Sequence, residues 1–255
     1  MLEFEDICMR YESRSGCTDA LAGVNLTVGD GEFVSIIGPS GCGKSTFLFL
    51  GSGLKRCSAG AVRYDGEELT KPIKDVGFVF QDHLLLEWRT VLSNVMIQGE
   101  FRGMDKKECR ERALRMIDSV GLSGFEGKYP HELSGGMQQR VSICRAMMHD
   151  PGLLMMDEPY GALDALTREQ MRVDLEKLWL EKKNTILFVT HDINESILLS
   201  DRIVVMTPRP GTIKEIIEVN LPRPRRLKIT ETAEFVDYRR RIIGLFLDMG
   251  ILHEN

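Results

Sequence analysis

The sequence predicts an α/β protein in which a parallel β-sheet carries a smaller helical subdomain. Short apolar runs typical of buried strands, such as FVSII at 33–37 and LLMMD at 153–157, alternate with helical patterns. Between about 88 and 150 the apolar period becomes helical, and the strand pattern returns afterwards. Strands and helices on both sides of a helical insertion are typical of a parallel sheet with helices on its faces.

Bulk composition narrows the function classes. The 255 residues are 43% hydrophobic and 28% charged, as in soluble globular proteins, and the net charge of −5 argues against a nucleic-acid-binding protein. No stretch approaches the roughly 18 apolar residues that indicate a membrane span. The first residues, MLEFEDICMRYE, carry acids and lack the apolar core of a signal peptide.

The six cysteines form no CxxC pair and no zinc spacing, which suits free thiols in a reducing cytosol. Apart from Cys42, each is expected to be a small buried hydrophobic residue. These positions are Cys8, Cys17, Cys57, Cys109 and Cys144.

Turn and capping signals set the limits of the remaining elements. Asp65-Gly66 marks a turn within the strand pattern at 60–69. Asp105 is expected to cap a helix, with Glu108 as its capping-box partner, and Gly121 to end it. The other expected elements are apolar strand runs at 2–12, 20–28, 75–81, 185–192 and 202–208, helices at 44–50, 165–181 and 192–199, and a final helix.

The segment LSGGMQQR at 133–140 begins another expected helix, with Ser134 as its N-cap. Gly135 and Gly136 occupy the first turn, where each glycine costs about 1 kcal/mol relative to alanine. Two such residues at a helix start indicate that bare backbone is required there.

Residues 38–46, GPSGCGKST, match the phosphate-binding loop G-x-x-x-x-G-K-[ST], after a strand and before a helix. Its glycines let backbone N–H groups turn inward around an anion, and the helix that follows adds the positive end of its dipole. Lys44 supplies a charge for the β- and γ-phosphates, and the Ser45 hydroxyl is a ligand for Mg²⁺. We therefore expect a nucleoside triphosphate to bind at Gly38, Pro39, Ser40, Gly41, Cys42, Gly43, Lys44, Ser45 and Thr46. Alkylation of Cys42 is expected to block that binding sterically.

Polar residues also end other expected strands. Asp157 ends the run LLMMD, where it can hold Mg²⁺ through water, and the adjacent Glu158 can accept a proton from an attacking water molecule. Gln81 and His191 end two further strands, and ligands of α/β sheets bind at such strand ends. Beside a phosphate-binding loop, this set predicts hydrolysis in addition to binding.

Taken together, GPSGCGKST, Gln81, LSGGMQQR, LLMMDEP, GALD (161–164) and His191 resemble the ATP-binding subunits of ATP-binding cassette (ABC) transporters over about residues 1–210. The resemblance implies a P-loop NTPase core with an antiparallel β subdomain and an inserted helical subdomain. It also implies a head-to-tail homodimer with two ATP molecules. Each ATP would lie between the P-loop of one chain and the LSGG segment of the other.

The same resemblance assigns roles to individual residues. Tyr11 falls where an aromatic ring stacks on adenine, and Asp164 lies in a loop that crosses the dimer interface. Gln81 senses Mg²⁺ and the membrane partner, and His191 contacts the γ-phosphate. The implied metal-binding residues are Ser45, Gln81 and Asp157, and the implied catalytic residues are Lys44, Glu158 and His191. The residues implied to act on the ATP of the other chain are Ser134, Gly135, Gly136 and, on the ribose side, Gln138.

Within the family, stretches such as 83–95 and 129–151 are similar to importer subunits for small solutes such as nitrate, sulfonate and taurine. Such a subunit is peripheral to the cytoplasmic face of the cell membrane. It works with integral membrane permease subunits and, indirectly, with an extracytoplasmic solute-binding protein. Glu87 stands where a proline commonly precedes Trp-Arg-Thr, in a segment expected to face the permease.

Three other functions are weighed against this one. An ABC exporter subunit would be distinguished from an importer subunit by the type of permease that co-purifies with it. A soluble ABC-type ATPase acting on ribosomes or DNA usually carries two cassettes or a long coiled coil, and this sequence shows neither. A P-loop kinase for a small molecule leaves LSGGMQQR and Glu158 unexplained.

The expected organisation has four parts. Residues 1–87 form the N-terminal part of the ATPase core, 88–150 the helical signature subdomain, 151–210 the C-terminal part of the core, and 211–255 a C-terminal extension. The extension carries a basic run, expected to be a solvated linker and helix face or a contact with acidic protein or lipid head groups. That run consists of Arg223, Arg225, Arg226 and Lys228, followed by 239–241.

Overall fold

The computed structural model describes residues 1–13, 16–161 and 163–253, which form two compact units. The first unit comprises Met1–Lys74 and Lys183–Asn255, and the second Asp75–Lys182. The second unit is longer than the helical segment expected at 88–150, because two strands and a long helix belong to it. Within the described residues, no helix is long and apolar enough to cross a membrane.

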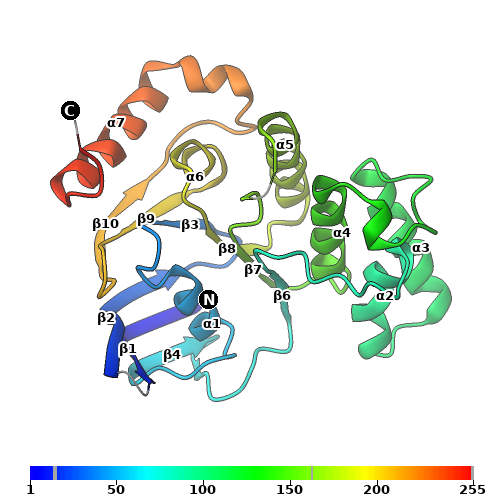
Figure 1. Ribbon diagram of the computed structural model, residues 1–255, viewed down its shortest axis with the longest axis horizontal. Helices are drawn as coiled ribbons and strands as arrows, with labels where there is room; N and C mark the ends of the chain where they lie inside the picture. Colours follow the sequence, from blue (N-terminus) through cyan, green and yellow to red (C-terminus); the bar gives the residue numbers. More distant parts are fainter. Residues whose placement is uncertain (14–15, 162, 254–255) are drawn as a thin grey trace. The chain divides into compact units, whose positions relative to one another are not determined.

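An antiparallel sheet forms one layer of the first unit. Its strand order is β2-β1-β4-β5, with β1 at Leu2–Ser13, β2 at Gly16–Val28, β4 at Ala59–Tyr64 and β5 at Glu67–Glu68 (Figure 1). Val24, Leu26 and Val28 are buried and alternate with exposed residues, as packing on one face requires. Asp65 and Gly66 have φ values of 53° and 81°, which confirms the expected tight turn between β4 and β5.

Parallel strands carry the phosphate-binding loop in the same unit. Strand β3 (Phe33–Ile37) lies between β8 (Thr185–Val189) and β9 (Arg202–Met206) and runs parallel to both. Strand β10 (Ile213–Glu218) is antiparallel to β9. Every residue of β3 and β8 is buried, which explains their uninterrupted apolar runs. Helices α1 (Lys44–Gly51) and α6 (Ile193–Leu199) follow β3 and β8.

The C-terminal extension is part of the core of the first unit. It contains the short helix η2 (Leu227–Glu231) and helix α7 (Ala233–Asp248). Phe235, Ile242 and Phe246 are buried in one apolar cluster with residues of α6, β9 and β10. The amphipathic pattern of α7 is therefore used for packing within the chain.

The expectation of a solvated basic run is wrong for two arginines. Arg225 is 1% exposed, and its guanidinium donates hydrogen bonds to the carbonyls of four residues. Arg223 donates to the Leu199 carbonyl at 2.7 Å and to Asp201 at 2.8 Å. Both side chains join the extension to the end of α6 because a guanidinium can satisfy several carbonyls that no backbone N–H reaches. The carbonyls bound by Arg225 are those of Ile197, Ser200, Val219 and Leu221.

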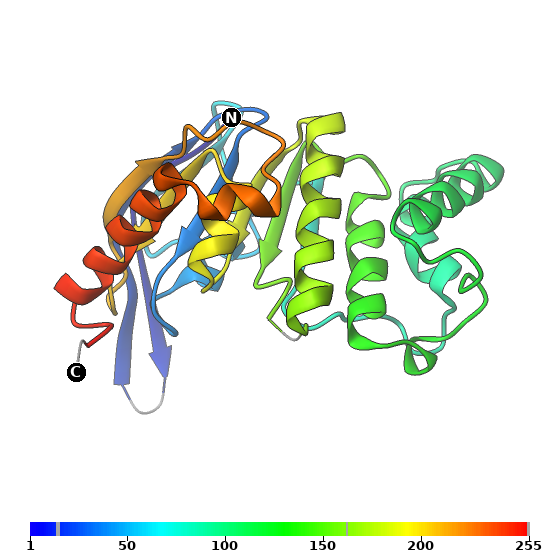
Figure 2. The same cartoon turned by 90° about the horizontal axis from the view of Figure 1, so that it is seen from above.

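The described residues of the second unit form four α-helices, one short 3-10 helix and two parallel strands. Strand β6 (Val76–Val79) pairs with β7 (Leu153–Asp157). Helices α2 (Val91–Phe101), α3 (Lys106–Ser119) and α4 (Gly135–Met147) share one apolar cluster, and α4 follows the short helix η1 (Pro130–Glu132). Helix α5 (Ala165–Lys182) lies beside α4 (Figure 2). Asp105 accepts hydrogen bonds from the N–H groups of Lys107 and Glu108, which confirms it as the N-cap of α3.

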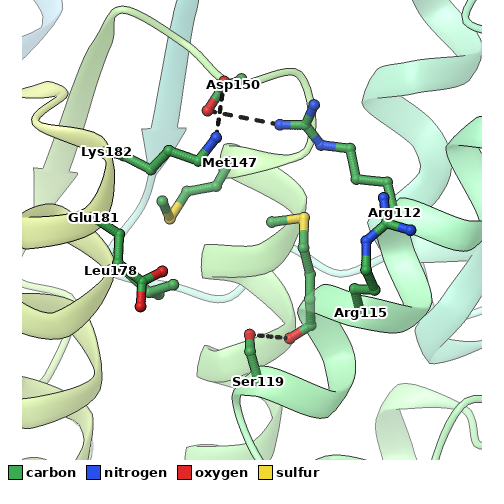
Figure 3. Close-up of a pocket in the computed structure, with 9 residues that line it drawn as sticks. Arg112, Arg115, Ser119, Met147, Asp150, Leu178, Glu181 and Lys182 are labelled. Atoms are coloured by element: carbon green, nitrogen blue, oxygen red, sulfur yellow. Dashed lines mark hydrogen bonds and ion pairs between the residues drawn. The ribbon is translucent and has the colours of Figure 1, made fainter.

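Asp150 connects helices α3 and α5. Its carboxylate accepts a hydrogen bond from Lys182 Nζ at 3.1 Å and lies 3.7 Å from the Arg112 guanidinium (Figure 3). These groups line a cavity of about 370 Å³ together with Met147, Leu178 and other residues. None of the residues expected to bind nucleotide lines this cavity, so we assign it to the packing of the helices.

The cysteines differ in their burial. Cys109 and Cys144 are buried as expected, and burial raises the pKa of the Cys144 thiol to about 12. The expectation is wrong for Cys17, which is exposed, and Cys8 and Cys57 are half-buried. Cys17 is exposed because it lies in the first residues of β2, which stay open to solvent.

Candidate ATP-binding site

The phosphate-binding loop leaves the buried strand β3 and enters α1. Gly41 and Gly43 have φ values of 74° and 105°, which a residue with a side chain rarely adopts. The Lys44 side chain is 5% exposed, and its Nζ donates to the carbonyls of Gly38 at 2.9 Å and Pro39 at 3.1 Å. The loop thus curls around a buried cation at a helix N-terminus, which is the arrangement that fits the phosphates of a nucleotide.

Tyr11 and Thr46 lie beside each other at this site. The Tyr11 hydroxyl, on β1, is 3.0 Å from Thr46 Oγ1 on α1. Lys55 Nζ lies 4.5 Å from the centroid of the Tyr11 ring and covers one of its faces. A base that stacks on Tyr11 would therefore use the other face.

His191 lies at the same edge of the first unit as the phosphate-binding loop. It follows β8, which is the parallel neighbour of β3, and its side chain is exposed. The residues on either side of it are anchored: Thr190 Oγ1 donates to Glu195 Oε2 at 2.6 Å, and Asp192 accepts from the Glu195 N–H at 3.0 Å. This short loop holds the imidazole at the carboxyl end of the strand.

The second unit brings Gln81, Asp157 and Glu158 to one edge of its strand pair. Gln81 follows β6 and is exposed, and Asp157 is the last residue of β7 and is 6% exposed. Glu158 has a left-handed φ of 43°, which costs a non-glycine residue on the order of 1 kcal/mol. The Gly161 N–H closes the turn by donating to the Glu158 carbonyl at 3.1 Å. Strain of this kind is common at functional sites.

The signature helix α4 begins as expected. Ser134 Oγ accepts a hydrogen bond from the Met137 N–H at 3.3 Å, which confirms Ser134 as the N-cap. A Cβ added to Gly136 would lie 2.6 Å from Thr167 Cγ2 on α5, so a side chain there would force one of the two residues to shift. Gly135 is in a more open place, since the nearest atom to an added Cβ is His83 Nε2 at 3.9 Å.

Two other predicted residues make contacts within the chain. Gln138 Nε2 donates to the carbonyls of Pro130 at 2.9 Å and Leu133 at 3.4 Å, so its amide nitrogen holds the turn before α4. Asp164 accepts from the Thr167 hydroxyl at 2.6 Å and from two N–H groups of α5. The hydrogen bond from Thr167 lowers the pKa of the Asp164 carboxyl. Ala162, within the GALD segment, lies outside the described residues.

The segment after Gln81 is linked to the signature helix by contacts that the sequence did not predict. His83 Nδ1 is 2.5 Å from Oε1 of Gln139, which is fully buried on α4. Arg145 donates from the same helix to the carbonyls of Leu84 at 2.6 Å and His83 at 2.9 Å. Gln139 and Arg145 are polar residues within the apolar pattern of α4, and this placement was the signal in the sequence that could have indicated these contacts.

Each unit thus carries part of the set of residues typical of a P-loop ATPase: the first unit carries the phosphate-binding loop and His191, and the second unit carries the acidic pair and Gln81. The profile of the ABC transporter family matches residues 21–161. An uncharacterized ABC transporter ATP-binding protein of Methanocaldococcus jannaschii, MJ0412, is 45% identical over 97% of this chain and 91% of its own length. The aliphatic sulfonates import ATP-binding protein SsuB of Bacillus cereus is 40% identical over 98% of each chain.

Among solved structures, the dimeric cassette MJ0796 in a post-hydrolysis state bound to ADP and Pi has a TM-score of 0.78. It is 34% identical and covers 87% of this chain and 100% of its own. The chain therefore belongs to the ABC transporter family, as an ATP-binding subunit whose hydrolysis of ATP is coupled to transport. The fold class expected from the sequence, an ABC ATPase of the P-loop class, is confirmed.

Proposed function

We propose that this ATPase drives an importer for a small solute such as a sulfonate, nitrate or taurine. The observation that carries the proposal is the 40% identity to an aliphatic sulfonates import subunit over 98% of both chains, which includes the C-terminal extension. The solute itself would be selected by the permease and an extracytoplasmic binding protein.

The ATP would be held between two copies of the chain arranged head to tail. The solved structures of MJ0796, a cassette that is dimeric and in one structure bound to ADP and Pi, support a dimer. In each site the loop at 38–46 of one copy would bind the phosphates. Ser134 and the N–H groups at Gly135 and Gly136 of the other copy would close onto the γ-phosphate. Ser134 and Gly135 are exposed at the start of α4, as this role requires.

Hydrolysis would use residues that follow strands and residues at the start of α1. Glu158 would accept a proton from the attacking water, and Lys44 and His191 would stabilise the charge that develops on the γ-phosphate. Ser45, Gln81 and Asp157 would hold Mg²⁺, which when bound neutralises phosphate charge. Tyr11 would stack on adenine. Asp164 would lie in the loop that crosses the interface. Gln138, whose amide nitrogen holds the turn before α4, would act on the ribose side of the ATP of the other copy.

The permease would dock on the segment that begins at 83, on the cytoplasmic face of the membrane. Three large apolar side chains are exposed in this part of the second unit: Leu84 at 56%, Trp88 at 75% and Phe101 at 76%. Glu87 is exposed among them, so an acidic side chain would face the permease where a proline is common in the importer group.

The proposed site is tested with Glu158→Gln. This variant should bind ATP, lose hydrolysis by at least about 100-fold, because a positioned general base contributes on the order of 10²–10⁴, and elute as an ATP-dependent dimer in size-exclusion chromatography. Adding Ser134→Arg should abolish the dimer while ATP binding to the monomer remains. Near-normal turnover of Glu158→Gln removes Glu158 from the role of base, and a dimer formed by the double variant contradicts the shared site.

The transport proposal has its own test. The subunit, co-expressed with its permease, should hydrolyse ATP faster in vesicles when the binding protein of the same importer is loaded with an aliphatic sulfonate, nitrate or taurine. Stimulation by a solute on the cytoplasmic side alone would instead identify an exporter.

A further inference from the structure

The turn between β9 and β10, residues 207–212, lies against the phosphate-binding loop. The Gly211 N–H donates to the Ala20 carbonyl at 2.9 Å, and the Gly211 carbonyl accepts from the Ala22 N–H at 3.1 Å. A Cβ added to Gly211 would lie 2.1 Å from the carbonyl oxygen of Cys42, so the backbones of turn and loop are in direct contact. Only glycine permits this approach.

Arg209 extends from this turn and binds one carbonyl of the loop. Its Nε and Nη2 both donate to the Gly41 oxygen, at 3.1 Å and 3.0 Å, although the two residues are 168 positions apart in sequence. Hydrogen bonds from an ionised donor are roughly twice as strong as neutral ones. The fork of the guanidinium therefore holds this carbonyl in a defined direction.

The direction of that carbonyl sets the direction of the N–H in the same peptide group. A trans peptide is planar, so the Cys42 N–H points away from the Gly41 carbonyl. The Cys42 N–H donates to the Pro39 carbonyl at 3.3 Å, and Lys44 Nζ donates to the same oxygen at 3.1 Å. Arg209 and Lys44 thus hold the peptide groups of the loop through different carbonyls.

We propose that Arg209 is a positioning residue for nucleotide binding, which holds the phosphate-binding loop in its curled conformation by binding the Gly41 carbonyl. The inference rests on the proposed ATP site, because Arg209 acts through the loop. A loop that is already curled binds an anion more tightly, since less conformational freedom is lost on binding. Loss of Arg209 therefore weakens nucleotide binding and leaves the chemical step largely unchanged once ATP is bound.

The test compares Arg209→Met, Arg209→Lys and wild type in MgADP titration calorimetry and in steady-state hydrolysis of MgATP. Arg209→Met is expected to raise the Kd for MgADP and the KM for ATP about tenfold, with kcat within about twofold, because two charge-assisted hydrogen bonds are lost. Arg209→Lys keeps the charge but not the fork, and should recover less than half of the lost affinity, measured as the logarithm of Kd. Arg240→Met, which removes an exposed arginine of α7, is the control for net charge and should bind like wild type.

Repeating the titrations at 0.5 M KCl distinguishes the effect of loop orientation from long-range attraction between Arg209 and the phosphates. At this ionic strength the Debye length is only a few ångströms, so long-range attraction is screened. The deficit of Arg209→Met should persist. A deficit that disappears in salt, or a Kd within about twofold of wild type, overturns the proposal. If Arg209→Met unfolds, Arg209→Gln is measured by the same criteria. Lys44→Ala distinguishes a failure of the proposed ATP site from a failure of the role of Arg209. If wild type binds MgADP no better than Lys44→Ala, the proposed function is contradicted. If wild type and Arg209→Met both bind MgADP tightly, only the role of Arg209 is contradicted.

Discussion

At the scale of single residues, Cys42 shows how the phosphate-binding loop controls the chemistry of a side chain. Its side chain is 1% exposed, and a Cβ added to Gly38 would lie 3.1 Å from its sulfur. Burial raises the pKa of the Cys42 thiol, and the charges of Lys44 and Arg209 act in the opposite direction. The thiol is therefore protonated and shielded from solvent at neutral pH.

We expect Cys42 to react with iodoacetamide at pH 7.5 at least about tenfold more slowly than the exposed Cys17, since the thiolate is the reactive form. Because the pKa of Cys42 is raised, its rate should still increase as the pH rises above 9. Once modified, the protein should no longer bind ATP. Site-resolved mass spectrometry and MgADP titration check both parts, with Cys17→Ser as the control. Unchanged binding after complete modification of Cys42 contradicts the steric role.

At the scale of elements, the start of helix α4 has to meet two requirements. Within the chain, Gly136 lets α4 approach Thr167 on α5, and an added Cβ would lie 2.6 Å from its methyl group. Among the described residues, the nearest atom to a Cβ added to Gly135 is 3.9 Å away, so packing within the chain does not require a glycine there, and the proposed phosphate contact is the reason that we give for it. Glycine at the two adjacent positions is thus explained by different physical reasons.

Gly136→Ala should lower the free energy of unfolding by about 1–3 kcal/mol, because overpacking outweighs the gain in helix propensity. Gly135→Ala should cause no loss. Thr167→Ser removes the methyl group and keeps the hydroxyl that Asp164 binds, so it should restore the stability of Gly136→Ala. Urea denaturation of the single and double variants measures this. Equal stability of the two alanine variants, or no rescue by Thr167→Ser, would contradict the packing explanation.

At the scale of the whole molecule, the C-terminal extension stabilises the first unit. Arg225 is buried and binds carbonyls at the end of α6 and after β10, and α7 adds Phe235, Ile242 and Phe246 to the same cluster. The extension therefore supplies part of the hydrophobic core that covers α6, β9 and β10 in the first unit. The buried side chain of Arg225 therefore has a structural role within the chain that requires no contact with lipid or with another protein.

Arg225→Met should lower the free energy of unfolding by at least about 3 kcal/mol, since several buried carbonyls lose their donor. The matched control, Arg226→Met, changes an exposed arginine next to it and should stay within about 0.5 kcal/mol of wild type. Guanidinium denaturation followed by circular dichroism compares the two. Similar stabilities would show that the buried guanidinium is not needed.

The features that could be predicted from the sequence are those whose interactions are local. The loop GPSGCGKST, the N-caps Asp105 and Ser134, and the buried run LLMMD each depend on residues that are close in sequence, so their spacing alone was informative. The roles of Arg209, Arg225 and Gly136 depend on partners that only folding brings near: Arg209 and Gly41 are 168 positions apart, and Gly136 meets a side chain of another helix. Their sequence context showed an arginine in a turn, a basic run and a weak helix start, because burial and close approach are properties of packing and carry no local signal.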